Sequence, residues 1–360
     1  MNRRVLLLAL AVLVALSCNL LGPGTATPPS GLFATLQAST PSGSFSTAPP
    51  ALTATSAFGN FPTITPTTAN NGSITPVPPP TAADGLTGHI VFTCQLFKVQ
   101  ASNQVCIMNA DGLGWRRLTT DDSRQHRYAS LSPDGLSVIY SAFREANVHE
   151  IYEMTLANDS VTQLTNKIGV LSAPEISPDG STITFTRASP NTNRNQIYLM
   201  NRNGSDPNNI PGIEGWDPTW SPDGKQILYA STNQSGSNQL FVIRTNGKNN
   251  QQVSNLPAIR GRSDWSPDGQ YIVTYSGEPW HHEVYIMSAD GSNTHQISPG
   301  GGNAQGPSFS PDGQWMAFTA YYDHYSDDQG CEIYVIRTNG TDLRRLTNND
   351  YCDYQPRWGP

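Results

Sequence analysis

The stretch WSPDGKQILYA, residues 220–230, decides the fold because parts of it recur along the chain. The four residues SPDG begin at Ser132, Ser177, Ser221, Ser266 and Ser310, at intervals of 44 or 45 residues. An apolar residue precedes each serine, and alternating apolar residues follow each glycine, as Ile227 and Tyr229 do here. A repeat with a period in the forties is typical of β-propeller blades, which contain four strands each.

The turn chemistry explains why these residues recur. Proline favours the first central position of a type I turn, aspartate suits the next position, and glycine adopts the left-handed conformation that completes a hairpin. A second apolar stretch follows in each unit, such as QLFVI at 239–243, and it ends in an Asx-Gly pair suited to tight hairpins. We therefore predict four antiparallel strands per unit. We interpret the SPDG aspartates as turn residues rather than as a catalytic or metal-binding series.

The two ends of the repeat region complement each other. Residues 89–94, HIVFTC, match the second strand of a unit and precede its third and fourth strands, whereas YQPRWGP at 354–360 matches a first strand alone. Pairing the two would complete one blade and leave no long free sheet edge. We therefore predict an all-β fold over residues 86–360: a six-bladed β-propeller of four-stranded antiparallel blades, closed by pairing of the N-terminal and C-terminal strands.

The repeated SPDG, the following strand of the type EIYVI, the Asx-Gly pair and the final Leu-Thr resemble the TolB-type propeller repeat, a WD-repeat-like family. The resemblance covers residues 86–360 and implies the propeller fold. The TolB protein itself looks like a periplasmic partner of Pal and Tol proteins and has an α/β domain before its propeller; here the stretch of residues 19–85 stands in that place. Similar propellers also accompany peptidase domains, but this sequence has no GxSxG motif.

The N-terminus has the features of an export signal. Two arginines precede twelve apolar residues, Val5 to Leu16, a run too short to span a bilayer and typical of a secretory signal peptide over residues 1–18. The sequence ALSC resembles a bacterial lipobox, although Ala15 stands where leucine is commonest. The resemblance implies cleavage before Cys18 and acylation of its thiol. The alternative is an ordinary secreted protein.

Residues 19–85 are rich in threonine, proline and serine and contain one charged residue, Asp84. We interpret them as a disordered stalk between the signal peptide and the propeller. The chain has 21 basic and 28 acidic residues, a net charge of −7, and no sustained basic face, which argues against a nucleic-acid partner. We expect an exported monomer, lipid-anchored to the outer side of the cytoplasmic membrane or in the periplasm, with the lipid as its only membrane contact.

Four further cysteines, an even number in an exported chain, indicate two disulfides. Cys94 ends a second strand and Cys106 begins the third strand beside it, so one disulfide can join this hairpin. Cys331 and Cys352 fall in loops at the same face of neighbouring blades. We therefore predict the pairs Cys94–Cys106 and Cys331–Cys352.

We call the face that carries the loops between second and third strands, and the connections between blades, the upper face. Function on a repeat scaffold concentrates where the repeats differ. Such departures occur in EPWHHEVY at 278–285, in 321–332, and between blades around the mouth of the central channel. The candidate binding face is His126, Arg127, Tyr128, Trp216, Arg260, Arg262, Trp280, His281, His282, Asp323, His324, Tyr325 and Tyr354.

The residues of this face favour binding over catalysis. Aromatic and arginine side chains around a concave mouth suit contact with an envelope protein, peptide or glycan. The leading hypothesis is therefore a non-enzymatic, lipid-anchored binding or scaffold module without a cofactor. The alternative is a propeller hydrolase or lyase with a metal at the channel mouth. The carboxylates of 321–332 are candidate Ca²⁺ ligands, although their spacing matches no EF-hand loop.

Overall fold

The computed structural model describes residues 85–96, 102–146, 148–189, 192, 194–322 and 330–360. The predicted signal peptide, the lipidation site Cys18 and residues 19–84 of the predicted stalk lie outside these ranges, as do the candidate residues Asp323, His324 and Tyr325. In the described part, no helix is long and apolar enough to cross a membrane.

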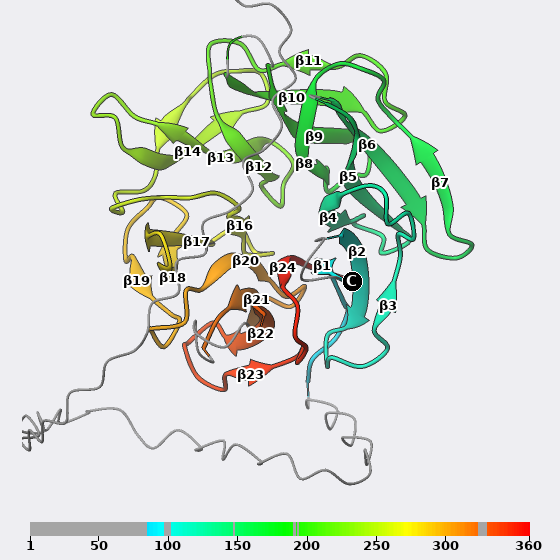
Figure 1. Cartoon of the computed structure of the whole chain (residues 1–360). Helices are drawn as coiled ribbons and strands as arrows, with labels where there is room; N and C mark the ends of the chain where they lie inside the picture. Colours follow the sequence, from blue (N-terminus) through cyan, green and yellow to red (C-terminus); the bar gives the residue numbers. More distant parts are fainter. Residues whose placement is uncertain (1–84, 97–101, 147, 190–191, 193, 323–329) are drawn as a thin grey trace, which may run out of the picture. The chain divides into compact units, whose positions relative to one another are not determined.

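The described chain folds into antiparallel sheets arranged as a ring. The strands form sets of four, and the first strand of each set lies innermost (Figure 1). Three sheets have four strands in sequence order. They are β12 (Trp216–Trp220), β13 (Gln226–Thr232), β14 (Asn238–Arg244) and β15 (Gln251–Gln252); β16 (Asp264–Trp265), β17 (Tyr271–Glu278), β18 (His281–Ser288) and β19 (His295–Gln296); and β20 (Gln305–Phe309), β21 (Trp315–Ala320), β22 (Glu332–Arg337) and β23 (Arg344–Arg345).

An eight-stranded sheet contains two antiparallel sets joined by one parallel pair, His149 with Val170. The first set is β4 (His126–Leu131), β5 (Ser137–Glu145), β6 (Val148–Thr155) and β7 (Ser160–Gln163). The second set is β8 (Val170–Ile176), β9 (Thr182–Ala188), β10 (Asn195–Asn201) and β11 (Asn208–Asn209).

The predicted pairing of the chain ends is confirmed. The last strand, β24 (Asp353–Gly359), lies innermost and pairs antiparallel with β1 (His89–Gln95), which continues to β2 (Asn103–Asn109) and β3 (Arg116–Arg117). Trp358 lies opposite Ile90, and its indole Nε1 donates to the Thr87 carbonyl at 2.8 Å. The C-terminal strand thus completes a sheet whose other strands come from the start of the repeat region.

The SPDG aspartates hold the hairpin turns together. In the first copy, the Ser132 hydroxyl donates to Asp134 Oδ1 at 2.6 Å, and the Leu136 amide donates to the same oxygen at 3.0 Å. Gly135 has φ 69°, the left-handed conformation that the turn requires. The serine–aspartate bond recurs in all five copies. The repeated aspartates are therefore turn residues.

The core lies between successive sets of strands. Six buried hydrophobic clusters each combine side chains of two neighbouring sets; for example, Phe92 of β1 packs in the same cluster as Trp315 of β21. A polar pair anchors the outer strand in five sets. The Thr165 hydroxyl, for example, donates to the buried carboxylate of Glu150 at 2.6 Å and accepts from the Ile151 amide at 2.9 Å. Equivalent hydrogen bonds from a serine or threonine hydroxyl to a glutamate or glutamine oxygen lie at the ends of β3, β15, β19 and β23.

Candidate functional site at the upper mouth of the ring

Bulges in the innermost strands shape the upper mouth. Register shifts interrupt the pairing of β4, β8, β12, β20 and β24 with their neighbours. At each bulge one residue has positive φ: Tyr128 (59°), Ala173 (49°), Asp217 (52°), Gly306 (57°) and Gln355 (58°). All five stand at the same place in the repeat, four residues before the serine of SPDG or its counterpart Gly359. A bulge bends the strand and re-aims its side chains, so these positions define the mouth.

Three side chains form an ion cluster across the middle of the ring. Each stands two residues after the repeat position at which the bulges lie. Arg357 of β24 lies 3.8 Å from the Glu175 carboxylate of β8 and 3.5 Å from that of Asp264 of β16. Its Nη2 also donates to the Ser263 carbonyl at 2.9 Å. These strands belong to sets that are not neighbours, so their side chains can meet only at the centre. The predicted channel is therefore bridged by side chains at this level.

The two acids of this cluster also link adjacent sets. Glu175 accepts from the Thr219 hydroxyl at 2.9 Å, and Asp264 accepts from the Ser308 hydroxyl at 2.8 Å. Burial raises the pKa of Glu175, while Arg357 has the opposing effect. The cluster is thus a structural centre that ties several innermost strands together.

Arg262 lies between the ion cluster and the upper face, and its side chain closes the centre of the ring there. Its guanidinium donates to the carbonyls of Gln355 and Ala129, both at 3.3 Å, and lies 5.7 Å from the Tyr128 ring centroid. The Asp217 carboxylate accepts from the Arg262 amide at 3.0 Å. Burial and the nearby Arg357 lower the pKa of Arg262 to about 10. Burial raises the pKa of Asp217, against the opposing effect of Arg262.

Several predicted face residues prove to be buried. His126 and Arg262 lie in the interior, and His282 packs edge-on against Tyr275 with its Nδ1 2.7 Å from Asn303 Oδ1. Burial lowers the pKa of His126 to about 4, so its ring is neutral at neutral pH. Burial does not favour a binding role for His126, Arg262 and His282, and their place in a binding face stays a prediction. Their strands turn them inward.

The other described candidates reach the surface or lie half-buried. Trp280 is 61% exposed at the turn between β17 and β18, and its ring centroid lies 6.2 Å from that of Tyr321. The Tyr321 hydroxyl lies 3.5 Å from the Sγ atom of Cys352, which stands two residues before Tyr354. Trp280 and Tyr321 thus form one aromatic pair, and Tyr128 of β4 and Tyr354 of β24 stand near the upper ends of innermost strands; we call these four side chains the aromatic strip. Arg127, Arg260 and His281 are exposed near it, and Trp216 is half-buried in β12.

The two disulfides stabilise strands near the upper mouth. Cys94 is bonded to Cys106 within the β1–β2 hairpin, and Cys331 is bonded to Cys352, the pairs that the sequence predicts. Cys331 precedes β22 and Cys352 precedes β24, so the second disulfide joins the last repeat to the closing strand. It therefore fixes the backbone beside Tyr354.

Sequence reasoning missed the residues at the centre of the ring. Glu175, Asp264 and Arg357 stand at one repeat position, where the other innermost strands have Ser130, Thr219 and Ser308. The sequence alone shows that three charged residues replace the small hydroxyl residues that the other units have at this position. Among the described residues, no group of three or more His, Cys, Asp or Glu side chains is arranged to hold a metal ion. The Ca²⁺ hypothesis concerned a loop whose residues 323–329 are not described.

Comparisons with known proteins agree with this architecture. A family model described as "TolB beta propeller domain" matches residues 83–278 and 217–360. The chain is 39% identical over 56 residues to the Tol-Pal system protein TolB of Alcanivorax borkumensis, covering 16% of this chain and 13% of that protein. It is 27% identical over 146 residues to the protein of the same name from Francisella tularensis, covering 40% and 33%.

Another relative is the uncharacterized peptidase YuxL of Bacillus subtilis, 27% identical over 106 residues that cover 28% of this chain and 16% of that protein. The chain thus spans about one third or less of these relatives. The crystal structure of TolB from Acinetobacter baumannii has a TM-score of 0.65 at 20% identity, over 76% of this chain and 67% of that chain. Kuenenia stuttgartiensis hydrazine synthase scores 0.61 at 14% identity, over 76% and 46%. At these identities the likeness concerns the fold.

Proposed function

Because this chain belongs to the TolB β-propeller family, we propose that it is an exported binding module whose protein or peptide partner docks at the upper mouth of the ring. We count six blades, taking the eight-stranded sheet as two sets of four strands. The six hydrophobic clusters support that count, because each joins two successive sets and together they go once around the ring.

The aromatic strip is the observation that carries the proposal. Large aromatic side chains beside arginine are the residues that dominate the energy of protein interfaces, since they bury much apolar area and keep a polar edge. Trp280 is the most exposed of them at 61%, and Arg127 and Arg260 lie at the same end of the ring. The ion cluster and Arg262 close the ring below them. A partner would therefore rest on the mouth rather than pass through it.

The N-terminal sequence and the disulfides support a location outside the cytoplasm. Two disulfides fit an oxidising compartment outside the cytoplasm. We propose that Cys18 carries a lipid anchor and that the stalk of residues 19–85 displays the monomeric propeller to envelope partners. Replacing Cys18 by Ala should release the protein from the membrane fraction on cell fractionation. Retention in that fraction would exclude the lipid as the anchor.

The docking proposal is tested by site-specific photo-crosslinking in cells that express the full chain. A photoreactive phenylalanine at position 280 or 354 should give a discrete crosslinked adduct with an envelope protein or peptide. Trp115 is a matched control, because it is also exposed, at 50%, and lies in the turn between β2 and β3 at the opposite end of the strands. Adducts of equal yield from position 115, or none from 280 and 354, would contradict docking at the mouth.

A further inference from the structure

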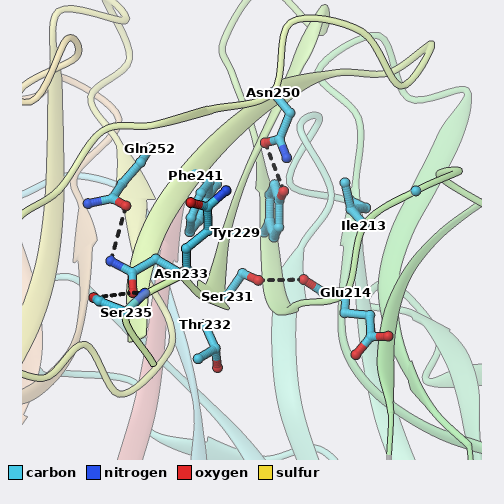
Figure 2. A pocket seen from close by; sticks show the side chains of 12 residues that line it. Ile213, Glu214, Tyr229, Ser231, Thr232, Asn233, Ser235, Phe241, Asn250 and Gln252 are labelled. Carbon is cyan, nitrogen blue, oxygen red and sulfur yellow. Dashed lines mark hydrogen bonds between the residues drawn. The ribbon is translucent and has the colours of Figure 1, made fainter. Parts of the chain in front are cut away.

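A separate cleft, whose lining shares no residue with the aromatic strip, opens beside the set of strands β12–β15. It measures about 510 Å³ and lies over β13, β14 and β15, next to the segment 212–214 that enters β12 (Figure 2). Tyr229 of β13 and Phe241 of β14 contribute aromatic rings whose centroids are 5.8 Å apart. The volume falls within the range of about 300–1,000 Å³ that small-molecule sites occupy.

The same place is filled in two other sets of strands. The aromatic pair recurs as Phe185 with Tyr198 and as Phe318 with Tyr334, and also as Tyr140 with Tyr152. In the first case, Arg187 of β9 lies 5.4 Å from the Tyr198 centroid and donates to its hydroxyl at 3.2 Å. In the second, the Tyr322 ring meets Tyr334 edge-on at 5.0 Å.

The small side chain of Ser231 leaves the cleft over β13 open. Ser231 stands where Arg187 stands in its own set, two residues after the first aromatic residue of the pair. Its hydroxyl donates to the Glu214 carbonyl at 2.6 Å, so it lies against the wall of the cleft (Figure 2). Small residues stand at this place in other sets as well, as Ala142 and Ala320 do, so Ser231 follows the repeat and Arg187 is the exception. The cleft therefore opens where neither an arginine such as Arg187 nor a ring such as Tyr322 covers the aromatic pair.

Neutral polar groups line the cleft and hold one another in place. Asn250 Oδ1 accepts from the Tyr229 hydroxyl at 2.9 Å, which turns the Asn250 amide group to a fixed orientation. Asn233 Nδ2 donates to Gln252 Oε1 at 3.3 Å, and Asn233 Oδ1 accepts from the Ser235 hydroxyl at 2.7 Å (Figure 2). Side chains ordered before binding lose less entropy when a ligand arrives.

The charges at the rim argue against an ionic ligand. Among the described residues of the lining, Glu214 alone is charged, and its carboxylate lies 3.1 Å from the Arg194 guanidinium. The remaining polar groups are amides and hydroxyls, which donate and accept hydrogen bonds as sugar hydroxyls do. The partly exposed Phe241 supplies apolar surface for the C–H face of a sugar ring.

We propose that this cleft binds a short neutral segment of a saccharide chain. The site differs from the mouth, so it adds a second ligand class to the proposed docking function. Sugar hydroxyls bond to Asn250, Asn233 and Gln252, and the ring lies against Phe241. Glu214 accepts one further hydroxyl at the rim.

The test measures binding of maltohexaose, cellohexaose and chitohexaose to the full chain by isothermal titration calorimetry, with an anionic alginate hexasaccharide as the charged comparison. At least one neutral hexasaccharide should bind, and alginate should bind at least ~10-fold more weakly, a difference of ~1.4 kcal/mol. Binding of alginate alone, or of none of the four, would overturn the proposal.

A pair of variants at one position locates the site. Ser231→Arg introduces the residue that fills the same place in β9, so it should keep the fold and weaken saccharide binding at least ~10-fold. Ser231→Ala keeps the cleft open and should bind within ~3-fold of the natural protein. Circular dichroism and thermal unfolding check that both variants fold. If Ser231→Arg unfolds, Asn250→Ala provides the same test, since it removes the amide group of an exposed residue outside the core. Equal binding by a folded Ser231→Arg or Asn250→Ala variant and the natural protein would place any saccharide site elsewhere.

Discussion

Replacing Arg357 by Met tests the ion cluster at the centre of the ring. The Arg357 side chain is only 7% exposed, and it compensates two carboxylates, Glu175 at 3.8 Å and Asp264 at 3.5 Å. Removing one partner of a buried ion pair leaves uncompensated charge and costs about 3–5 kcal/mol. Chemical unfolding at pH 7 should therefore show a free energy of unfolding lower by about that amount.

The loss should depend on pH. Burial raises the pKa of Glu175 and Arg357 opposes that rise, so the variant should have a Glu175 pKa that is raised further. A carboxyl group whose pKa is higher in the folded state than in the unfolded state stabilises the fold below its unfolded pKa. That contribution is lost as pH rises through the folded pKa. Arg357→Met should therefore lose more stability at pH 7 than at pH 4.

Two further variants make the result decisive. Glu175→Gln in the Arg357→Met background should lose less than the sum of the single losses, with a coupling of at least ~0.5 kcal/mol. Arg244→Met removes an exposed arginine at the end of β14 and should change stability by no more than ~0.5 kcal/mol. A loss below ~1 kcal/mol for Arg357→Met, or an equal loss at both pH values, would refute the ion cluster as a stabilising centre.

Three other outcomes follow from the same structure. Deleting residues 353–360 removes β24 and leaves the edge of β1 unpaired, so the truncated protein should lose its single cooperative unfolding transition in calorimetry; an unchanged melting curve would contradict ring closure. Thr347→Val removes the hydroxyl that donates to the buried Glu332 carboxylate and should cost about 1–3 kcal/mol in chemical unfolding, whereas the exposed Thr341→Val should not. Burial raises the pKa of Asp353 to about 7, so its contribution to stability is present at pH 4 and is lost as pH rises toward 7. Asp353→Asn should therefore reduce the fall in melting temperature between pH 5 and 7.5, and an unaltered fall would show that Asp353 does not titrate in this range.

Much of the architecture could be predicted because turns are local. The SPDG serine and aspartate form hydrogen bonds with each other and with amides within five residues, so they form the turn without contacts from distant parts of the chain. The closing strand was also predictable, because YQPRWGP supplies the one strand that the first unit lacks.

The candidate site was less predictable, because burial depends on how neighbouring strands pack. His281 and His282 are adjacent in sequence, yet one is exposed and the other packs on Tyr275. The predicted arginine at the mouth, Arg262, lies inside the ring, whereas exposed Trp280 meets Tyr321, the first residue of the segment 321–332 that departs from the repeat. Residue type alone does not tell which side of a strand faces the centre.

The sequence by itself determined the repeat, the hairpin turns and the pairing of the chain ends, because each rests on short-range chemistry or on complementary halves of one unit. Only the tertiary structure decided that Arg357 meets Glu175 and Asp264 at the centre, and that Ser231 leaves a cleft that Arg187 fills in another set of strands. The reason is physical. A repeat specifies the structure of each unit, but contacts across the ring join residues more than 90 positions apart. Whether a side chain fills a space depends on the neighbours that surround it.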